Sequence, residues 1–299
     1  MPRLFSAYVI VDWSAASKPA QGADSIWIGV LKRDVRFRLA FEAFNPATRA
    51  EAETKLNAVL DDLKRRSERA LVGFDFPLGF PRGFAAALKL PGEQPWRAAW
   101  DQVAKMVTDK PTNLNNRFGV ASEINRRLTG GPFPFWGCPP KDALTTLQPK
   151  RSRPHGPDDL PEFRHAEIEA KGTSSIWKTY YNGSVGGQAI LGIPVVRRLR
   201  DRREGLRAWP FETGYKTLTE ADLTGVDAVL AEVYPSMVKP QGAAGEVKDL
   251  QQVRTLAEHF ARLDEANKLG ALFGPAKGAA AEVVVDAERE EGWILGAGA

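Results

Sequence analysis

Residues 7–13 read Ala-Tyr-Val-Ile-Val-Asp-Trp, a run of apolar and β-branched residues that ends at an acid. Such a run predicts a strand buried on both faces, as the central strands of a largely parallel sheet are. Residues 70–76 (Ala-Leu-Val-Gly-Phe-Asp-Phe) repeat the pattern, and residues 228–234 (Ala-Val-Leu-Ala-Glu-Val-Tyr) show it again. Each run carries one acid near its carboxyl end, and these acids are Asp12, Asp75 and Glu232.

The segments between these runs predict an α/β fold. Residues 25–32 and 35–44 predict two further strands, and the second is a half-exposed edge because its apolar residues alternate with charged ones. Residues 48–66 predict a helix, since Thr48 is followed three residues later by an acid that completes a capping box. The chain therefore opens β-β-β-α-β. A second amphipathic helix is expected over residues 249–272.

Residues 91–224 differ from both flanks, because prolines and glycines recur and the apolar residues lie in isolated patches. We interpret this segment as a large insertion into one domain of residues 1–299, whose core is formed by 1–90 and 225–299. Within the insertion, residues 150–171 are polar and contain three prolines. They predict an exposed loop whose deletion leaves folding intact.

The insertion leaves the core just after Asp75 and returns just before Glu232. We therefore expect residues 91–224 to cover the edge of the sheet where these acids lie. In that arrangement Trp177, Lys178 and the loop 183–188 face Asp12.

The composition limits the chemistry that is available. Hydrophobic residues make up 43% of the chain and charged residues 26%, which excludes global disorder. A single cysteine, Cys138, excludes an intramolecular disulfide, and the three histidines make a His-rich metal centre unexpected. The 37 Asp and Glu residues remain as the source of metal ligands or acid–base groups.

The charge and hydropathy patterns bear on partners and location. A net charge of +4 permits nucleic-acid binding without requiring it. No apolar run approaches the roughly 18 residues of a membrane span, and the first residues show no secretory signal. We expect a cytoplasmic protein with no membrane partner.

Three acids near the carboxyl ends of their strands would converge if the strands are neighbours in the sheet. Ligands of open α/β sheets bind at that edge. A cluster of carboxylates without His or Cys is the ligand set that Mg²⁺ or Mn²⁺ prefers, and such ions activate water for phosphodiester cleavage. The alternative is that each acid caps the turn or helix that follows it.

Three motifs carry a resemblance to a known family. Residues 11–15 (Val-Asp-Trp-Ser-Ala), 73–81 (Gly-Phe-Asp-Phe-Pro-Leu-Gly-Phe-Pro) and 232–236 (Glu-Val-Tyr-Pro-Ser) together resemble the DUF429 family of predicted nucleases. The resemblance covers residues 8–81 and 225–295. It implies a ribonuclease H-like mixed sheet with a large insertion.

The resemblance also implies a set of metal ligands. Asp12 would bridge two ions, while Asp75 and Glu232 would each complete one coordination sphere. Ribonuclease H-like nucleases place a further acid at the start of the C-terminal helix, and Asp249 is the candidate for that position. Its alternative role is that of a helix N-cap.

Substrate contacts are expected from basic and loop residues. Lys18 or Lys178 could steady a phosphate, and the glycine-rich loop 182–188 places Ser184 and Gln188 where backbone N–H groups could meet an anion. Six arginines crowd residues 197–207, Arg198 among them. They indicate either a phosphate-binding ridge or the solvated face of a helix.

The leading hypothesis is therefore a metal-dependent nuclease or phosphodiesterase that uses Mg²⁺ or Mn²⁺ and acts on nucleic acid or a small phosphoester. The alternatives are a ribonuclease H-like scaffold that binds or assembles without catalysis, and a phosphoryl-transfer enzyme, since actin-like ATPases and sugar kinases share the β-β-β-α-β opening.

Overall fold

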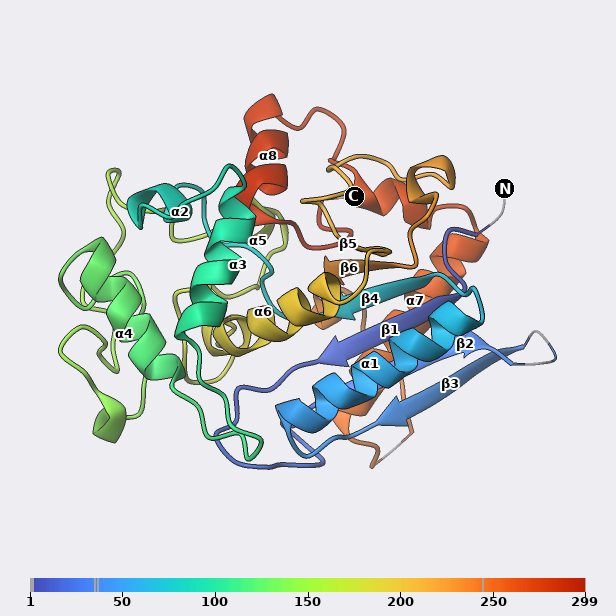
Figure 1. Ribbon diagram of the computed structural model, residues 1–299, viewed down its shortest axis with the longest axis horizontal. Helices are drawn as coiled ribbons and strands as arrows, with labels where there is room; N and C mark the ends of the chain where they lie inside the picture. Colours follow the sequence, from blue (N-terminus) through green and yellow to red (C-terminus); the bar gives the residue numbers. More distant parts are fainter. Residues whose placement is uncertain (1–2, 35, 37, 244, 299) are drawn as a thin grey trace.

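The computed structural model describes residues 3–34, 36, 38–243 and 245–298. Within these residues the chain forms a mixed α/β structure around a six-stranded sheet of order β3-β2-β1-β4-β6-β5 (Figure 1). The strands are β1 (Ala7–Asp12), β2 (Trp27–Arg33), β3 (Leu39–Phe44), β4 (Ala70–Phe74), β5 (Leu206–Ala208) and β6 (Ala228–Glu232). Strands β1, β2 and β3 are antiparallel neighbours, whereas β4 is parallel to β1 and β6 is parallel to β4 and β5.

The α/β class and all five expected strands are confirmed. Val35 and Phe37, which the sequence pattern placed in the third strand, lie outside the described residues. The sixth strand, β5, was not expected, because three residues beside an arginine-rich helix carry no alternating pattern.

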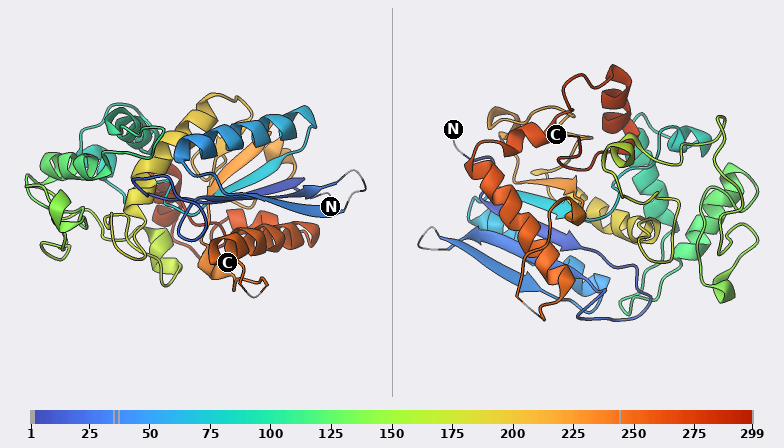
Figure 2. Two further views of the ribbon diagram at one scale, coloured as in Figure 1. Left: turned by 90° about the horizontal axis from the view of Figure 1, so that it is seen from below. Right: turned by 180° about the vertical axis from the view of Figure 1, so that it is seen from behind.

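Helices cover both faces of the sheet. They are α1 (Arg49–Arg65), α2 (Phe84–Ala87), α3 (Pro95–Met106), α4 (Arg117–Leu128), α5 (His165–Glu169), α6 (Gly186–Asp201), α7 (Lys248–Glu265) and α8 (Ala281–Asp286). Shorter helical turns are η1 (Pro140–Asp142), η2 (Ala221–Leu223), η3 (Pro235–Met237), η4 (Leu269–Phe273) and η5 (Ala287–Glu291). Figure 2 (left) shows α1 and α6 on one side of the sheet and α7 on the other.

Both expected helices are present with small changes at their ends. Thr48 caps α1, since its hydroxyl accepts the N–H of Glu51 at 3.2 Å. The helix expected over residues 249–272 ends at Glu265 and is followed by η4. Asn267, with φ of 55°, adopts the left-handed conformation that stops a helix.

Successive residues of the central strands enter different cores. Val9 and Val11 of β1 pack in the apolar cluster that includes α1 and α6, whereas Tyr8 and Ile10 pack in the cluster that includes α7. This alternation is the period of two that every strand has. It places the next even-numbered residue, Asp12, on the α7 side of the sheet.

The segment 91–224 contributes to the central sheet and to its apolar core. It supplies β5 to the sheet, and α6 is buried along most of its length. Its side chains Trp100, Trp177 and Ile190 belong to the same apolar cluster as the strands.

The expectation that residues 150–171 form an exposed loop is wrong for their second half. Arg164, Ala166, Glu167 and Ala170 are buried. The reason is an ion-pair network centred on Arg164, which is described below.

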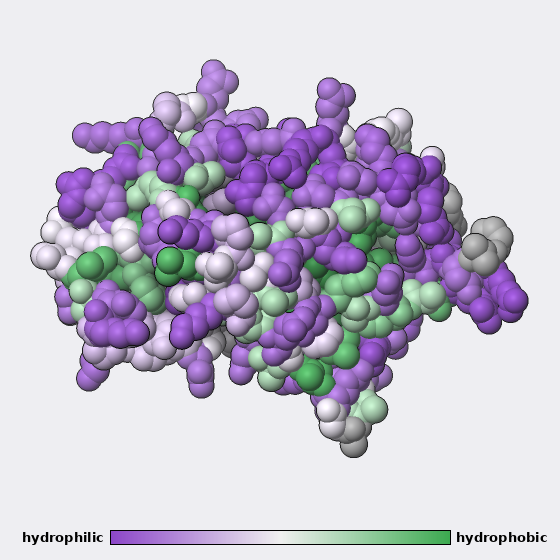
Figure 3. All heavy atoms as spheres, turned by 60° about the horizontal axis from the view of Figure 1, so that its bottom comes forward, coloured by the Kyte–Doolittle hydropathy of each residue, from purple (hydrophilic) through white to green (hydrophobic). Residues whose placement is uncertain are grey.

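The surface on one side of the molecule is mostly polar (Figure 3). On the face that Figure 3 shows, hydrophilic side chains predominate and apolar ones form separate patches. No helix in the described part of the chain is long and apolar enough to cross a membrane.

The turn of residues 73–81 depends on one close backbone approach. A Cβ at Gly79 would lie 2.3 Å from the carbonyl oxygens of both Glu290 and Glu291 in η5. We predict that Gly79→Ala lowers the free energy of unfolding by about 1–3 kcal/mol, which is the usual cost of overpacking a site. Urea denaturation measures the change. Gly131→Ala is the matched control, because nothing lies within 4 Å of a Cβ there. Equal midpoints for the two variants would contradict the prediction.

Candidate functional site

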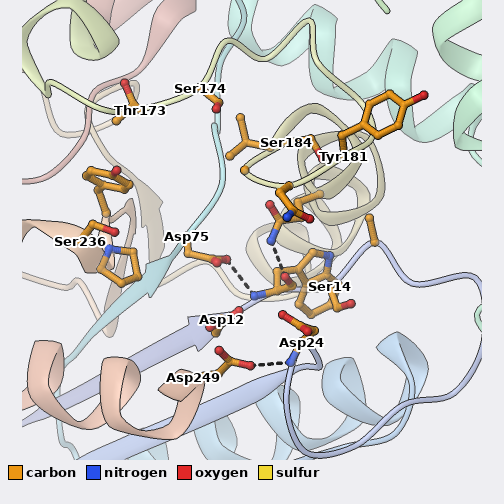
Figure 4. A pocket seen from close by; sticks show the side chains of 18 of the residues that line it. Asp12, Ser14, Asp24, Asp75, Thr173, Ser174, Tyr181, Ser184, Ser236 and Asp249 are labelled. Atoms are coloured by element: carbon orange, nitrogen blue, oxygen red, sulfur yellow. Dashed lines mark hydrogen bonds between the residues drawn. The ribbon is translucent and has the colours of Figure 1, made fainter. Parts of the chain in front are cut away.

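A pocket of about 1040 Å³ opens where β1 and β4 end (Figure 4). Its walls come from the loop between β1 and β2, from residues 172–174 and 179–185 of the inserted segment, from residues 234–236 and from the start of α7. The volume lies at the upper end of the range typical of small-molecule sites.

Two carboxyl groups meet in this pocket because of the strand register. Val11 pairs with Phe74 in the parallel β1–β4 ladder, so that Asp12 and Asp75 follow as neighbours on the α7 side. The N–H of Trp13 donates to Oδ1 of Asp75 at 2.8 Å, and the N–H of Asp75 donates to the carbonyl of Val11 at 3.2 Å. The carboxyl groups of Asp12 and Asp75 are within hydrogen-bonding reach of each other.

Two more acids line the same pocket. Asp249 lies in the first turn of α7, and its Oδ2 accepts the N–H of Asp24 at 2.8 Å. Asp24 precedes β2 and has φ of 55°. Figure 4 shows Asp249 and Asp24 beside Asp12.

This crowding shifts the protonation of the acids. Burial raises the pKa of Asp75 to about 7. Burial, together with the negative charges of Asp75 and Asp249, raises the pKa of Asp12 well above its usual value. The pKa of Asp249 is also raised, chiefly by burial. At neutral pH the Asp12–Asp75 pair therefore tends to retain a proton, which a bound cation would replace.

Glu232 is not brought into this pocket, and the expected convergence of three strand acids has to be corrected to two. Glu232 pairs with Phe74 in the β4–β6 ladder, one residue before Asp75. Its side chain therefore belongs to the opposite face of the sheet from Asp12 and Asp75. There both of its oxygens bind Arg164, at 2.7 and 2.8 Å.

Arg164 is the centre of a buried network. Besides Glu232 it binds the carboxylate of Glu167 at 2.6 Å and the carbonyl oxygen of Glu291 at 2.7 Å. The Glu291 carboxylate in turn accepts the N–H groups of Arg82 and His165, at 2.9 and 2.7 Å. Glu232 thus ties the insertion and the C-terminal segment to the sheet.

Only some of the residues predicted to contact substrate line the pocket. Ser184 and Gln188 line the pocket, and the Gln188 amide donates to the Trp13 carbonyl. Lys18, Lys178 and Arg198 are not among the lining residues.

The side chains of Lys178 and Arg198 are engaged elsewhere. Lys178 Nζ donates to the carbonyl of Asn182 at 2.6 Å, and Arg198 pairs with Glu53 at 2.6 Å. Other arginines of residues 197–207 are also paired with carboxylates, namely Arg197 with Asp101, Arg200 with Glu212, and Arg203 with Asp61. Trp177, which was expected to face Asp12, is buried in the core.

Asp24 and Arg117 are pocket residues that no sequence motif indicated. Asp24 stands before the second strand, where an acid is ordinarily read as a turn residue. Arg117 begins α4 in the segment 91–224. Only the sheet register and the path of the inserted segment bring them to Asp12.

The donors at Asp12 and Asp75 fit a hard cation. No group of three or more His, Cys, Asp or Glu in the described ranges is arranged so as to hold a metal ion. Mg²⁺, however, is commonly bound by one or two carboxylates and completes its octahedron with water and substrate oxygens. Asp12 and Asp75 would be those carboxylates, with Asp249 beside them.

Comparisons with protein-family models, curated proteins and solved structures find no match to this chain. The resemblance to DUF429 therefore stays a prediction from the three motifs.

The raised pKa values predict how stability depends on pH. Between about pH 4 and pH 7 the folded chain holds a proton at Asp75 that the unfolded chain releases, so the free energy of unfolding falls as the pH rises through this range. Asp75→Asn removes the titrating group and keeps an acceptor for Trp13. We predict that, in chelator, the wild type loses about 1–3 kcal/mol more than this variant between pH 5 and pH 8. Urea denaturation at each pH measures it, and parallel pH profiles would be evidence against the pair.

The Arg164 network predicts a large loss on truncation. Arg164→Met leaves Glu232 and Glu167 buried without a cation, which should lower the free energy of unfolding by about 3–5 kcal/mol. Adding Glu232→Gln should restore part of that loss, because the two residues are coupled. Arg126→Met is the control, since its ion pair with Glu123 is exposed. A loss no larger than that of the control would refute this account of Glu232.

Proposed function

We propose that the protein is a metal-dependent phosphoester hydrolase, of the nuclease or phosphodiesterase type, that uses Mg²⁺ or Mn²⁺ at Asp12 and Asp75. The observation that carries the proposal is the pair itself. Two half-buried carboxyl groups lie within hydrogen-bonding reach at the end of two parallel strands. No lysine or arginine of residues 3–34, 36, 38–243 and 245–298 forms an ion pair with either of them.

The residues of the chain have distinct tasks in this proposal. A divalent cation would stabilise the negative charge that develops on the phosphoryl oxygens. Asp12 and Asp75 hold it, and the Trp13 N–H fixes the orientation of Asp75. Asp249, oriented by the Asp24 N–H, adds negative charge on the α7 side. These hydrogen bonds set the carboxylates before a substrate arrives, which is the preorganisation that such sites need.

The walls of the pocket favour a small phosphoester over a duplex. Residues 172–174 and 179–185 line the same pocket as the acids and form part of its wall. The arginines of residues 197–207, which would contact a polynucleotide backbone, are instead largely paired with carboxylates. A substrate of the size of a nucleotide or dinucleotide suits the volume.

The topology supports a ribonuclease H-like assignment as part of this proposal. Strands β1, β2 and β3 are antiparallel, α1 follows, and β4 returns parallel beside β1. This is the β-β-β-α-β opening that the motif resemblance implies. The acids at Asp12 and Asp75 lie where that resemblance implies two metal ligands.

A second candidate is a binding or assembly protein that uses the same scaffold without catalysis. The engagement of Glu232 by Arg164 favours it, because this removes one of the carboxylates that a two-metal site would use. Phosphoryl transfer is not proposed, since the loop after β1 reads Ser-Ala-Ala-Ser at residues 14–17 instead of a glycine-rich phosphate loop.

Metal binding tests the proposal directly. We predict that saturating Mg²⁺ or Mn²⁺ raises the Tm of the wild type by about 5 °C, because a ligand that binds only the folded state stabilises it. Asp12→Asn and Asp75→Asn should lose this shift. Asp158→Asn, a change at an exposed acid outside the pocket, should retain it.

Hydrolysis of bis(p-nitrophenyl) phosphate and of a panel of nucleotides and dinucleotides then separates the two candidates. Turnover that requires the metal and is lost in Asp12→Asn supports the hydrolase. Metal binding with no turnover of any phosphoester favours the binding protein. The absence of any Tm shift at millimolar metal would contradict the proposal.

A further inference from the structure

One arginine on the pocket wall lacks a charge partner. Arg117 begins α4 and is only 6% exposed. The other buried arginines all have carboxylate partners: Arg49 pairs with Asp109, Arg164 with Glu167 and Glu232, and Arg203 with Asp61. No carboxylate in the described part of the chain forms an ion pair with Arg117.

Only one nitrogen of this guanidinium, Nη1, forms hydrogen bonds with the described residues. Arg117 Nη1 donates to Oγ of Ser17 at 2.8 Å and to Oδ1 of Asn115 at 3.0 Å. Its Nε is buried with no hydrogen-bond partner, and among the residues described no acceptor is bonded to Nη2. The ring of Phe118 lies 4.2 Å from the guanidinium carbon. Because Nε has no accessible surface and Nη1 is already bonded, Nη2 is the guanidinium nitrogen that an oxyanion could reach.

A buried cation in this state is unfavourable for the folded protein. Burial, and then the positive charge of Arg49, lowers the pKa of Arg117 to about 10. A buried N–H without an acceptor adds a further penalty. An anion supplied from outside the chain would balance this charge, and it could reach Nη2 because Arg117 lines the pocket.

Arg117 is also close to the segments that carry the acids. A Cβ at Gly187 would lie 3.4 Å from Cδ of Arg117 and 3.3 Å from Cβ of Ala15, so the arginine adjoins both the start of α6 and the loop after Asp12. The acids come from the ends of β1 and β4 and from α7, whereas Arg117 comes from α4. The pocket thus has acidic residues and a cationic wall, which suits a ligand carrying both a bound cation and an anionic group.

We infer that Arg117 is an anion subsite that binds a phosphoryl group of the substrate through Nη2. This inference rests on the proposed function, because the acidic pair and Arg117 line the same pocket. It assigns the substrate class as a small phosphoester whose phosphate is recognised by an arginine as well as by the cation. Ser17 and Asn115 act as positioning residues, since they orient the guanidinium through Nη1.

Calorimetric titration of the full chain tests the subsite, with inorganic phosphate, 5′-AMP and acetate as probes, each with and without Mg²⁺. We expect phosphate and 5′-AMP to bind the wild type and to bind Arg117→Met about 10- to 100-fold more weakly. Arg117→Lys should retain part of the affinity, because it keeps the charge and loses the planar guanidinium. Arg126→Met, on the exposed side of the same helix, should bind as the wild type does.

The Tm of each variant shows whether it is folded, and Arg117→Met should be at least as stable as the wild type because it removes an unpaired buried charge. Undiminished phosphate binding in Arg117→Met, or no phosphate binding by the wild type under either condition, overturns the subsite. Acetate binding as tight as phosphate binding overturns the phosphoryl assignment. The Mg²⁺-induced Tm shift of Arg117→Met separates the two proposals: if it persists while phosphate binding is unaffected, the subsite fails and the metal site stands.

Discussion

The parallel pairing of β1 with β4 sets two carboxyl groups side by side, where burial makes it unfavourable for both to be ionised. The register makes Asp12 and Asp75 neighbours, and the Trp13 N–H holds Asp75 in place. Burial strengthens the repulsion between like charges and raises the pKa of both groups. Without a basic partner from the described residues, the pair is balanced by a retained proton or by a cation. That need is why the site is interpreted as a cation site.

The two faces of this sheet edge carry different groups of acids. On the α7 side, Asp12 and Asp75 face the pocket. On the opposite side, Glu232 is locked to Arg164, which also binds Glu167 and the backbone of η5. The buried arginine joins the inserted segment, the sheet and the C-terminal turns into one structure. Glu232 therefore contributes to stability, whereas Asp12 and Asp75, at the ends of the neighbouring strands, carry the proposed chemistry.

The sequence predicted most of the sheet, because buried β-branched runs and the capping box at Thr48 are local signals. It also identified Asp12, Asp75 and Asp249, which the structure places in one pocket. It could not assign Glu232, because the face that a strand residue occupies depends on the register between β4 and β6, and a shift of one residue reverses it. The burial of Arg164 and Arg117 could not be predicted from the sequence either. Arg117 begins α4 and Arg164 caps α5, and no local pattern in segment 91–224 distinguishes a buried arginine from a solvated one.

The central claim is that Asp12 and Asp75 hold a divalent cation, and anomalous diffraction from a crystal of the wild type soaked in Mn²⁺ tests it most directly. The account predicts a manganese peak within about 2–2.5 Å of a carboxylate oxygen of each residue, as hard-cation coordination requires. A crystal that contains Mn²⁺ only at surface sites, with none at Asp12 and Asp75, would contradict it.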